Sequence, residues 1–165
     1  MREILFRAKR IDNGEWVEGN LIFSESVGKK SEAFIIPIKF GNTFVQLKEE
    51  NLGFRYWHRI DKETICQYTG LTDKNGKKIW ENDILMCHGN PNDLVKVVFG
   101  EFGVRNAETG TVVDKVIGWH YEVIPTDEIS RIEPFCYSMP LTKDYVELCE
   151  LEVVDKPELL QEAQE

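Results

Sequence analysis

The side chains best suited to metal binding or nucleophilic chemistry are four cysteines and three histidines: Cys66, Cys87, Cys136, Cys149, His58, His88 and His120. The cysteines form no C-x-x-C pair, so zinc-finger and thioredoxin-like sites do not fit. A metal site could be drawn around Cys87 and His88, but adjacent residues of a strand point to opposite faces. Cys66 and His120 would have to complete it. We therefore predict no metal or cofactor, and reduced cysteines that pack as small hydrophobic side chains in a cytosolic protein.

Motifs of the common catalytic sites are absent from the sequence. The chain contains no G-x-S-x-G, P-loop, G-x-G-x-x-G or H-E-x-x-H. A catalytic pair of a cysteine nucleophile and a histidine base stays possible, because such residues meet in space rather than in sequence. His58 and His120 both fit packed strand positions, and the acidic pairs Asp127–Glu128 and Glu49–Glu50 are typical of solvated turns. We predict no catalytic residue and no enzyme, and an enzyme with a concealed site is the least favoured alternative.

Several aromatic side chains could stack on nucleic-acid bases: Trp16, Trp57, Trp80, Trp119, Tyr56, Tyr68 and Tyr121. Most lack neighbouring cations along a groove, which favours places in a core or a domain junction over a binding platform. The N-terminal part is the exception, because basic residues stand near its aromatic residues: Arg7, Lys9, Arg10, Arg55 and Arg59. A nucleic-acid contact there stays open as an alternative.

Charge is unevenly distributed along this acidic chain. The formal net charge is −9, from 20 basic and 29 acidic residues. Residues 1–60 carry ten basic and eight acidic residues, whereas 61–165 carry ten and twenty-one. This balance argues against a broad DNA-binding face, which needs Lys and Arg. The acidic stretch 144–165 is typical of a solvated terminus, and the alternative is a nucleic-acid mimic or a surface for a basic partner.

The composition is that of a folded protein. Of 165 residues, 42% are hydrophobic and 30% charged, which argues against a disordered chain, a collagen or a long coiled coil. No apolar run approaches the roughly 20 residues that span a bilayer. The opening MREILFRAKR lacks the apolar stretch of a secretion signal. We therefore predict a cytoplasmic protein with no membrane partner.

Alternation of apolar and polar residues, broken by turn residues, predicts mostly strands. Residues 3–10 and 15–23 form a predicted hairpin around Asn13–Gly14, since Asn-Gly supplies positive φ angles. Further strands are predicted over 33–40, 43–47, 54–60, 84–87, 94–99, 102–105, 112–117 and 119–124. Residues 126–128 could cap one short turn, and Pro157 opens a predicted helix over 159–163.

These elements predict a mainly β protein. We expect compact antiparallel hairpins, a small SH3-like barrel-type sheet and a short C-terminal helix, with strand above about 35% and helix below about 20%. An N-terminal β lobe over 1–60 and a C-terminal β lobe with an acidic tail over 61–165 together form one domain.

The most patterned segment of the chain is Gln67-Tyr68-Thr69-Gly70-Leu71-x-Asp73-Lys74-Asn75-Gly76-Lys77-x-Ile79-x-Glu81-x-Asp83-Ile84. We expect Gly76 at a positive-φ turn position where a side chain would clash with backbone. Asp83 is expected to accept backbone N–H bonds at the start of the strand from Ile84. This segment resembles the YopX family of phage and prophage proteins. Residues 4–8, 16–19 and 152–160 resemble the two ends of that family.

Two departures from the family pattern concern local geometry. Asn82 stands where a glycine is expected, and Asn tolerates left-handed backbone. The link 154–156 is shorter than usual. The resemblance implies a small mostly-β accessory protein and brings no catalytic residue or cofactor. The signature residues are interpreted as structural: Gln67, Tyr68, Thr69, Gly70, Leu71, Asp73, Asn75, Gly76 and Asp83.

The function that these observations favour is a non-enzymatic phage or prophage accessory protein in the host cytoplasm. We expect it to bind a host or phage macromolecule, most simply a protein. The alternatives are a nucleic-acid module that uses the basic N-terminal lobe, and an acidic nucleic-acid mimic. A homo-oligomer stays open.

Overall fold

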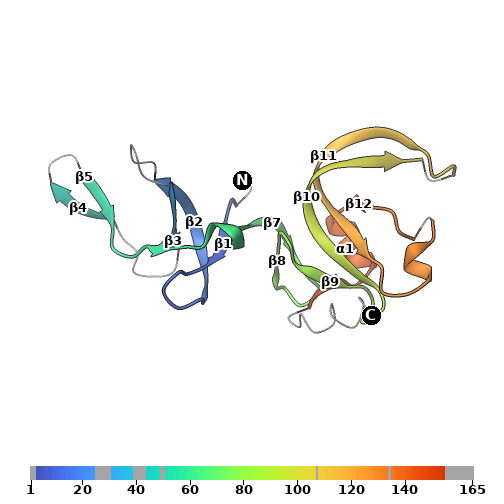
Figure 1. Ribbon diagram of the computed structural model, residues 1–165, viewed down its shortest axis with the longest axis horizontal. Coiled ribbons are helices and arrows are strands. Elements are labelled where there is room, and N and C mark those ends of the chain that lie inside the picture. The colour runs from blue at the N-terminus through green and yellow to red at the C-terminus, as the bar shows by residue number, and fades with distance from the viewer. Residues whose placement is uncertain are drawn as a thin grey trace. The chain divides into compact units, whose positions relative to one another are not determined.

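The computed structural model describes residues 3–24, 31–38, 44–48, 51–106, 108–133 and 135–154. Of these residues, 52% are in strands and 9% in helices, which confirms the mainly β class. The chain divides into two compact units, residues 1–68 and 69–165 (Figure 1). The division predicted from the sequence follows residue 60. The later position follows from Cys66 and Gln67, which pair with the first strand and so belong to the first unit.

The first unit is built on an antiparallel sheet with the order β6-β3-β2-β1-β7. Its strands are β1 (Phe6–Lys9), β2 (Trp16–Ser24), β3 (Glu32–Pro37), β6 (His58–Arg59) and the start of β7 (Cys66–Thr72). A separate hairpin consists of β4 (Phe44–Lys48) and β5 (Asn51–Phe54), and a short 3-10 helix covers Lys62–Thr64. Alternate residues of the sheet fill a small core: Ala8, Ala33, Ile35 and Ile60.

The predicted hairpin between β1 and β2 is confirmed, with Phe6 opposite Gly19 and Lys9 opposite Trp16. Its turn differs from the expectation. Of the Asn-Gly pair only Gly14 has a positive φ, 72°. The Gly14 N–H donates to the Arg10 carbonyl at 3.0 Å, so the connection is a longer loop rather than a two-residue turn.

The second unit contains a five-stranded antiparallel sheet with the order β12-β11-β10-β9-β13. Its elements are β8 (Lys78–Trp80), β9 (Ile84–Met86), β10 (Leu94–Arg105), β11 (Val112–Ile124), β12 (Met139–Pro140), α1 (Lys143–Leu148) and β13 (Glu152–Val153). A 3-10 helix covers Ile129–Arg131, where residues 126–128 were predicted to cap a turn. Strand β8 adjoins the end of β7. The strand orders are linear, so the described sheets form no closed barrel and the SH3-like expectation is wrong in that detail.

The long hairpin of β10 and β11 dominates the second unit, and Figure 1 shows both strands strongly curved. Each strand was predicted as two shorter strands separated at a glycine. In the structure Gly100 and Gly118 lie directly opposite each other and both strands continue through them. Glycine carries no side chain to resist a bend, so it curves a strand here instead of ending it.

The core of the second unit lies between this hairpin, β9 and α1. It contains Ile79, Leu85, Cys87, Val95, Val97, Tyr121, Leu141, Val146 and Leu151. Helix α1 was not predicted, and it begins at Thr142, whose hydroxyl accepts the Tyr145 N–H at 3.2 Å. The helix predicted over 159–163 lies outside the described residues. Within the described part of the chain, no helix is long and apolar enough to cross a membrane.

Candidate binding pocket

The first half of the signature fixes the end of β7. Thr69 is buried, and its hydroxyl donates to the Ile79 carbonyl at 2.8 Å and accepts the Leu71 N–H at 3.1 Å. Gly70 has a φ of 89°, so the strand carries a local irregularity between these two contacts. Tyr68 is also buried, whereas Gln67 lies opposite Phe6 in the sheet.

Asp73 connects the signature turn to the end of the described chain. One carboxylate oxygen accepts the N–H groups of Asn75 and Lys77, both at 2.8 Å. The other accepts the Val153 N–H at 3.0 Å. Asp73 is only 5% exposed, and all three donors are backbone groups. This carboxylate therefore joins the turn to β13, 80 residues further along the chain.

The turn at Asn75–Gly76 and the corner at Asp83 follow the sequence expectations in part. Gly76 has the expected positive φ, 80°, but no atom lies within 4 Å of where its Cβ would be. The cost of a side chain there thus comes from the local backbone conformation and not from contact with distant atoms. Asp83 accepts the N–H of Trp80 at 2.9 Å, a contact with the strand before the corner. Asn82 adopts a φ of 64°, as a glycine would.

The cysteines and histidines are dispersed. No group of three metal-binding side chains gathers within the described segments, and the four cysteines form no disulfide. Burial, followed by nearby Asp93, raises the pKa of the Cys87 thiol to about 12. His120 is a packed strand residue, as predicted: it is buried, and its ring stacks on Phe102 with centroids 4.7 Å apart. Burial lowers the pKa of His58.

Two arginines of the basic N-terminal lobe form ion pairs. Arg10 donates to Asp12 at 2.9 Å, and Arg59 pairs with Glu32 at 2.6 Å. These two arginines border a groove of about 640 Å³ that is also lined by Lys9, Lys62, Glu32 and Asp61, so its basic residues outnumber its acidic ones.

The aromatic side chains of the proposed stacking platform are divided between core and surface. Trp80, Tyr68 and Tyr121 are buried, whereas Trp16, Tyr56 and Trp57 are exposed. The face of Trp16 is approached by Arg7 at 4.9 Å and Lys9 at 5.6 Å. Trp57 packs edge-on against Phe34, 5.3 Å between centroids, in an apolar hollow rather than a basic groove.

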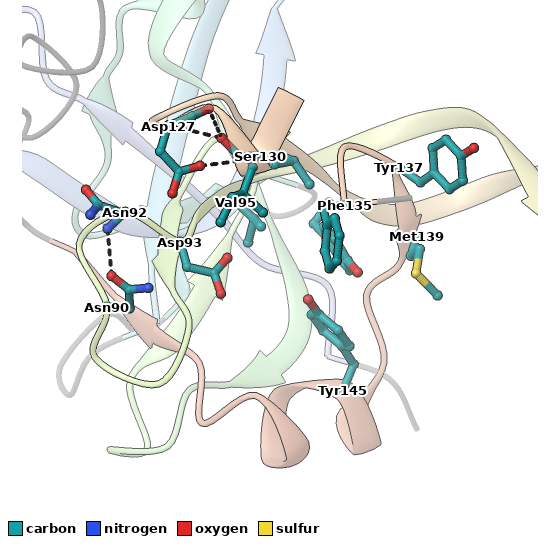
Figure 2. A pocket seen from close by; sticks show the side chains of 13 residues that line it. Asn90, Asn92, Asp93, Val95, Asp127, Ser130, Phe135, Tyr137, Met139 and Tyr145 are labelled. Atoms are coloured by element: carbon teal, nitrogen blue, oxygen red, sulfur yellow. Dashed lines mark hydrogen bonds between the residues drawn. The ribbon is translucent and has the colours of Figure 1, made fainter. Parts of the chain in front are cut away.

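A cavity of about 400 Å³ in the second unit gathers polar and aromatic side chains from segments distant in sequence (Figure 2). Its lining comes from five segments: the loop before β10, the start of β10, the end of β11, the segment after β11, and α1. The lining residues are Asn90, Asn92, Asp93, Val95, Tyr121, Val123, Asp127, Ile129, Ser130, Phe135, Tyr137, Met139 and Tyr145. The only charged residues among them are Asp93 and Asp127, so the pocket is acidic.

Asp127 is held by a local hydrogen-bond loop with Ser130. Its carboxylate accepts the Ser130 N–H at 2.8 Å, and the Ser130 hydroxyl donates to the Asp127 carbonyl at 3.0 Å. Hydrogen bonds from the Ser130 N–H and hydroxyl lower the pKa of the Asp127 carboxyl, and nearby Arg131 adds to this. Asp127 is therefore ionised at neutral pH.

The wall of the pocket is aromatic. The rings of Tyr121 and Tyr145 stack with centroids 4.5 Å apart and planes 15° from parallel. Burial raises the pKa of both phenols, so both keep their protons at neutral pH. The rim is apolar and open to solvent, because Ile129, Phe135 and Met139 are 60%, 62% and 51% exposed.

Tyr137 also borders a second cavity, of about 390 Å³. On that side the guanidinium carbon of Arg105 lies 3.7 Å from the centre of the Tyr137 ring. This second cavity is lined by both His120 and Cys136, so it brings one cysteine–histidine combination together.

Residues 5–133 match the family described as YopX protein. The chain belongs to the YopX family. No curated protein and no solved structure matches it. The matched region of this YopX member includes the whole signature and the pocket residues up to Ser130. The aromatic residues Phe135, Tyr137 and Tyr145 lie beyond the matched region.

Only part of this pocket was predicted from the sequence. Tyr121 was a candidate stacking residue and Asp127 was one of a solvated pair. Asp93, Phe135 and Tyr145 were not predicted. Phe135 itself could have indicated a binding surface. It is a large apolar residue in a stretch without strand alternation, so the sequence pattern assigns it no core position.

Proposed function

We propose that this YopX-family chain is a non-enzymatic interaction module of a phage or prophage, which acts in the host-cell cytoplasm and binds a protein partner. The observation that carries the proposal is the exposed apolar rim of the acidic pocket, formed by Ile129, Phe135 and Met139. Exposed apolar and aromatic side chains around a concave centre are typical of the positions that dominate protein–protein affinity.

The chemistry of the pocket supports binding rather than catalysis. Tyr121 and Tyr145 keep their protons, and the pKa of neighbouring Cys87 is raised to about 12, so these groups are poor bases and nucleophiles at neutral pH. The carboxylate of Asp127 is engaged by Ser130. Groups that do not change protonation near neutral pH can still form hydrogen bonds and ion pairs with a bound partner.

A nucleic-acid module is the second candidate, supported by Arg7 and Lys9 beside the exposed Trp16. It is weaker because Arg10 and Arg59 are each paired with an acidic residue, which reduces the charge available to phosphates. The proposed acidic mimic depends on the terminal stretch 144–165, half of which lies outside the described residues.

Affinity capture from infected cells tests the proposal with two matched variants. Ile129→Ser alters the pocket rim, and Ile117→Ser alters an isoleucine that is 73% exposed on β11 and does not line the pocket. We expect one protein to be recovered with the wild type and with Ile117→Ser, and to be lost with Ile129→Ser. Equal recovery with both variants contradicts the proposed surface. Recovery that nuclease treatment abolishes supports the nucleic-acid candidate instead.

A further inference from the structure

We propose that the acidic pocket receives an arginine side chain of the partner, an inference that rests on the proposed function. The first reason is charge. Asp93 and Asp127 are the only charged residues that line the pocket, and neither forms an ion pair with a cationic side chain of the described segments. Asp127 is ionised and nearby Arg131 offsets its charge only in part, so a cation entering the pocket meets negative charge, whereas a phosphate is repelled.

The second reason is the combination of carboxylates with ring faces. Figure 2 shows the carboxylate of Asp93 and the hydroxyl of Tyr145 directed toward the same space, with the ring of Phe135 beside it. A guanidinium is planar, so it can stack on an aromatic face while its edge donates to a carboxylate. A compact ammonium group has no flat face to stack on the ring and cannot form the two-pronged contact with a carboxylate.

The third reason is that an arginine of the chain already stacks on Tyr137, a residue of the pocket wall, from the side of the second cavity. The Arg105 guanidinium lies 3.7 Å from the centre of the Tyr137 ring and donates to the Gly110 carbonyl at 2.8 Å. Tyr137 lines both cavities, whereas Arg105 lines only the second. The acidic pocket thus offers the same kind of aromatic wall, with carboxylates and no arginine of its own.

Two-dimensional NMR of the labelled full chain tests this inference with defined probes. The probes are the acetylated, amidated tripeptides Gly-Arg-Gly, Gly-Lys-Gly and Gly-citrulline-Gly, where citrulline has the shape of arginine without its charge. We expect the arginine peptide to shift the amide signals of pocket residues, and its dissociation constant to be at least about tenfold lower than that of the citrulline peptide. The lysine peptide is expected to lie between them.

Variants of the two carboxylates provide the matched comparison. The double variant Asp93→Asn, Asp127→Asn keeps the side-chain shapes and removes the charge, and Asp114→Asn removes an exposed carboxylate outside the pocket. The double variant should weaken arginine binding at least about tenfold, and Asp114→Asn should leave it unchanged. The amide spectrum of each variant reports whether it is folded.

The outcomes separate this inference from the proposed function. The arginine inference is overturned if the arginine peptide binds no more tightly than the citrulline peptide or the lysine peptide. It is also overturned if the shifts are confined to residues outside the pocket. If Ile129→Ser still abolishes capture of the partner, the proposed function stands without it. Arginine-specific shifts in the pocket support the inference even if the capture experiment returns no protein.

Discussion

Replacing Asp73 with alanine should destabilise the second unit more than any other single change in the signature. The substitution removes the acceptors of three backbone N–H groups, those of Asn75, Lys77 and Val153. A hydrogen bond to a charged group contributes about 1.5–3 kcal/mol. Water can replace the carboxylate at the exposed Asn75 and Lys77, so we expect a loss of about 3–4 kcal/mol, a large share of the roughly 5–15 kcal/mol that stabilises a domain.

Urea unfolding followed by circular dichroism measures this loss from the midpoint at constant slope. Asp73→Asn keeps an oxygen for the turn but places an amide group opposite the Val153 N–H, so its loss should be about half that of Asp73→Ala. Asp114→Ala, at an exposed position, is the control and should change the midpoint little. If Asp73→Ala and Asp114→Ala unfold at the same urea concentration, the structural interpretation of the signature is refuted.

The remaining predictions concern single groups. Gly76→Val and Asp83→Ala should each lower the free energy of unfolding by about 1–3 kcal/mol, through a strained positive φ and a lost hydrogen bond, whereas a binding loop would show wild-type melting with lost capture. A carbon-detected NMR titration should find the pKa of Asp127 below its usual value, and Ser130→Ala should raise it. Because the folded-state pKa is lowered, stability from this carboxylate is present above the unfolded pKa and is lost as the pH falls through the folded one. Cys87 should react with iodoacetamide in the native protein only well above neutral pH, and all four thiols should titrate after denaturation without bound zinc in native mass spectrometry.

Local chemistry allowed several features to be predicted from the sequence. The hairpin of β1 and β2, the positive φ of Gly76 and the backbone contact of Asp83 depend on residues close together in the chain. Asn82 shows the same dependence, since its side chain tolerates the left-handed backbone that the corner requires.

Features set by distant contacts were not predictable in the same way. Gly100 and Gly118 were expected to end strands, but pairing with each other keeps both strands continuous. The short helix α1 is stabilised by the packing of Val146 in the core and by one cap, not by a strong helical pattern. The pocket joins residues from position 90 to position 145, so no local pattern could reveal it.

Site-specific photo-crosslinking in infected cells tests the central claim, that the rim of the pocket binds a protein, most directly. A photoreactive benzoylphenylalanine would replace Phe135 on the rim or, as the control, Ile117, which is also exposed but lies outside the pocket. We expect a covalent adduct of one defined partner from position 135 and none from position 117. The absence of an adduct from position 135, or the same adducts from both positions, would refute binding at the rim.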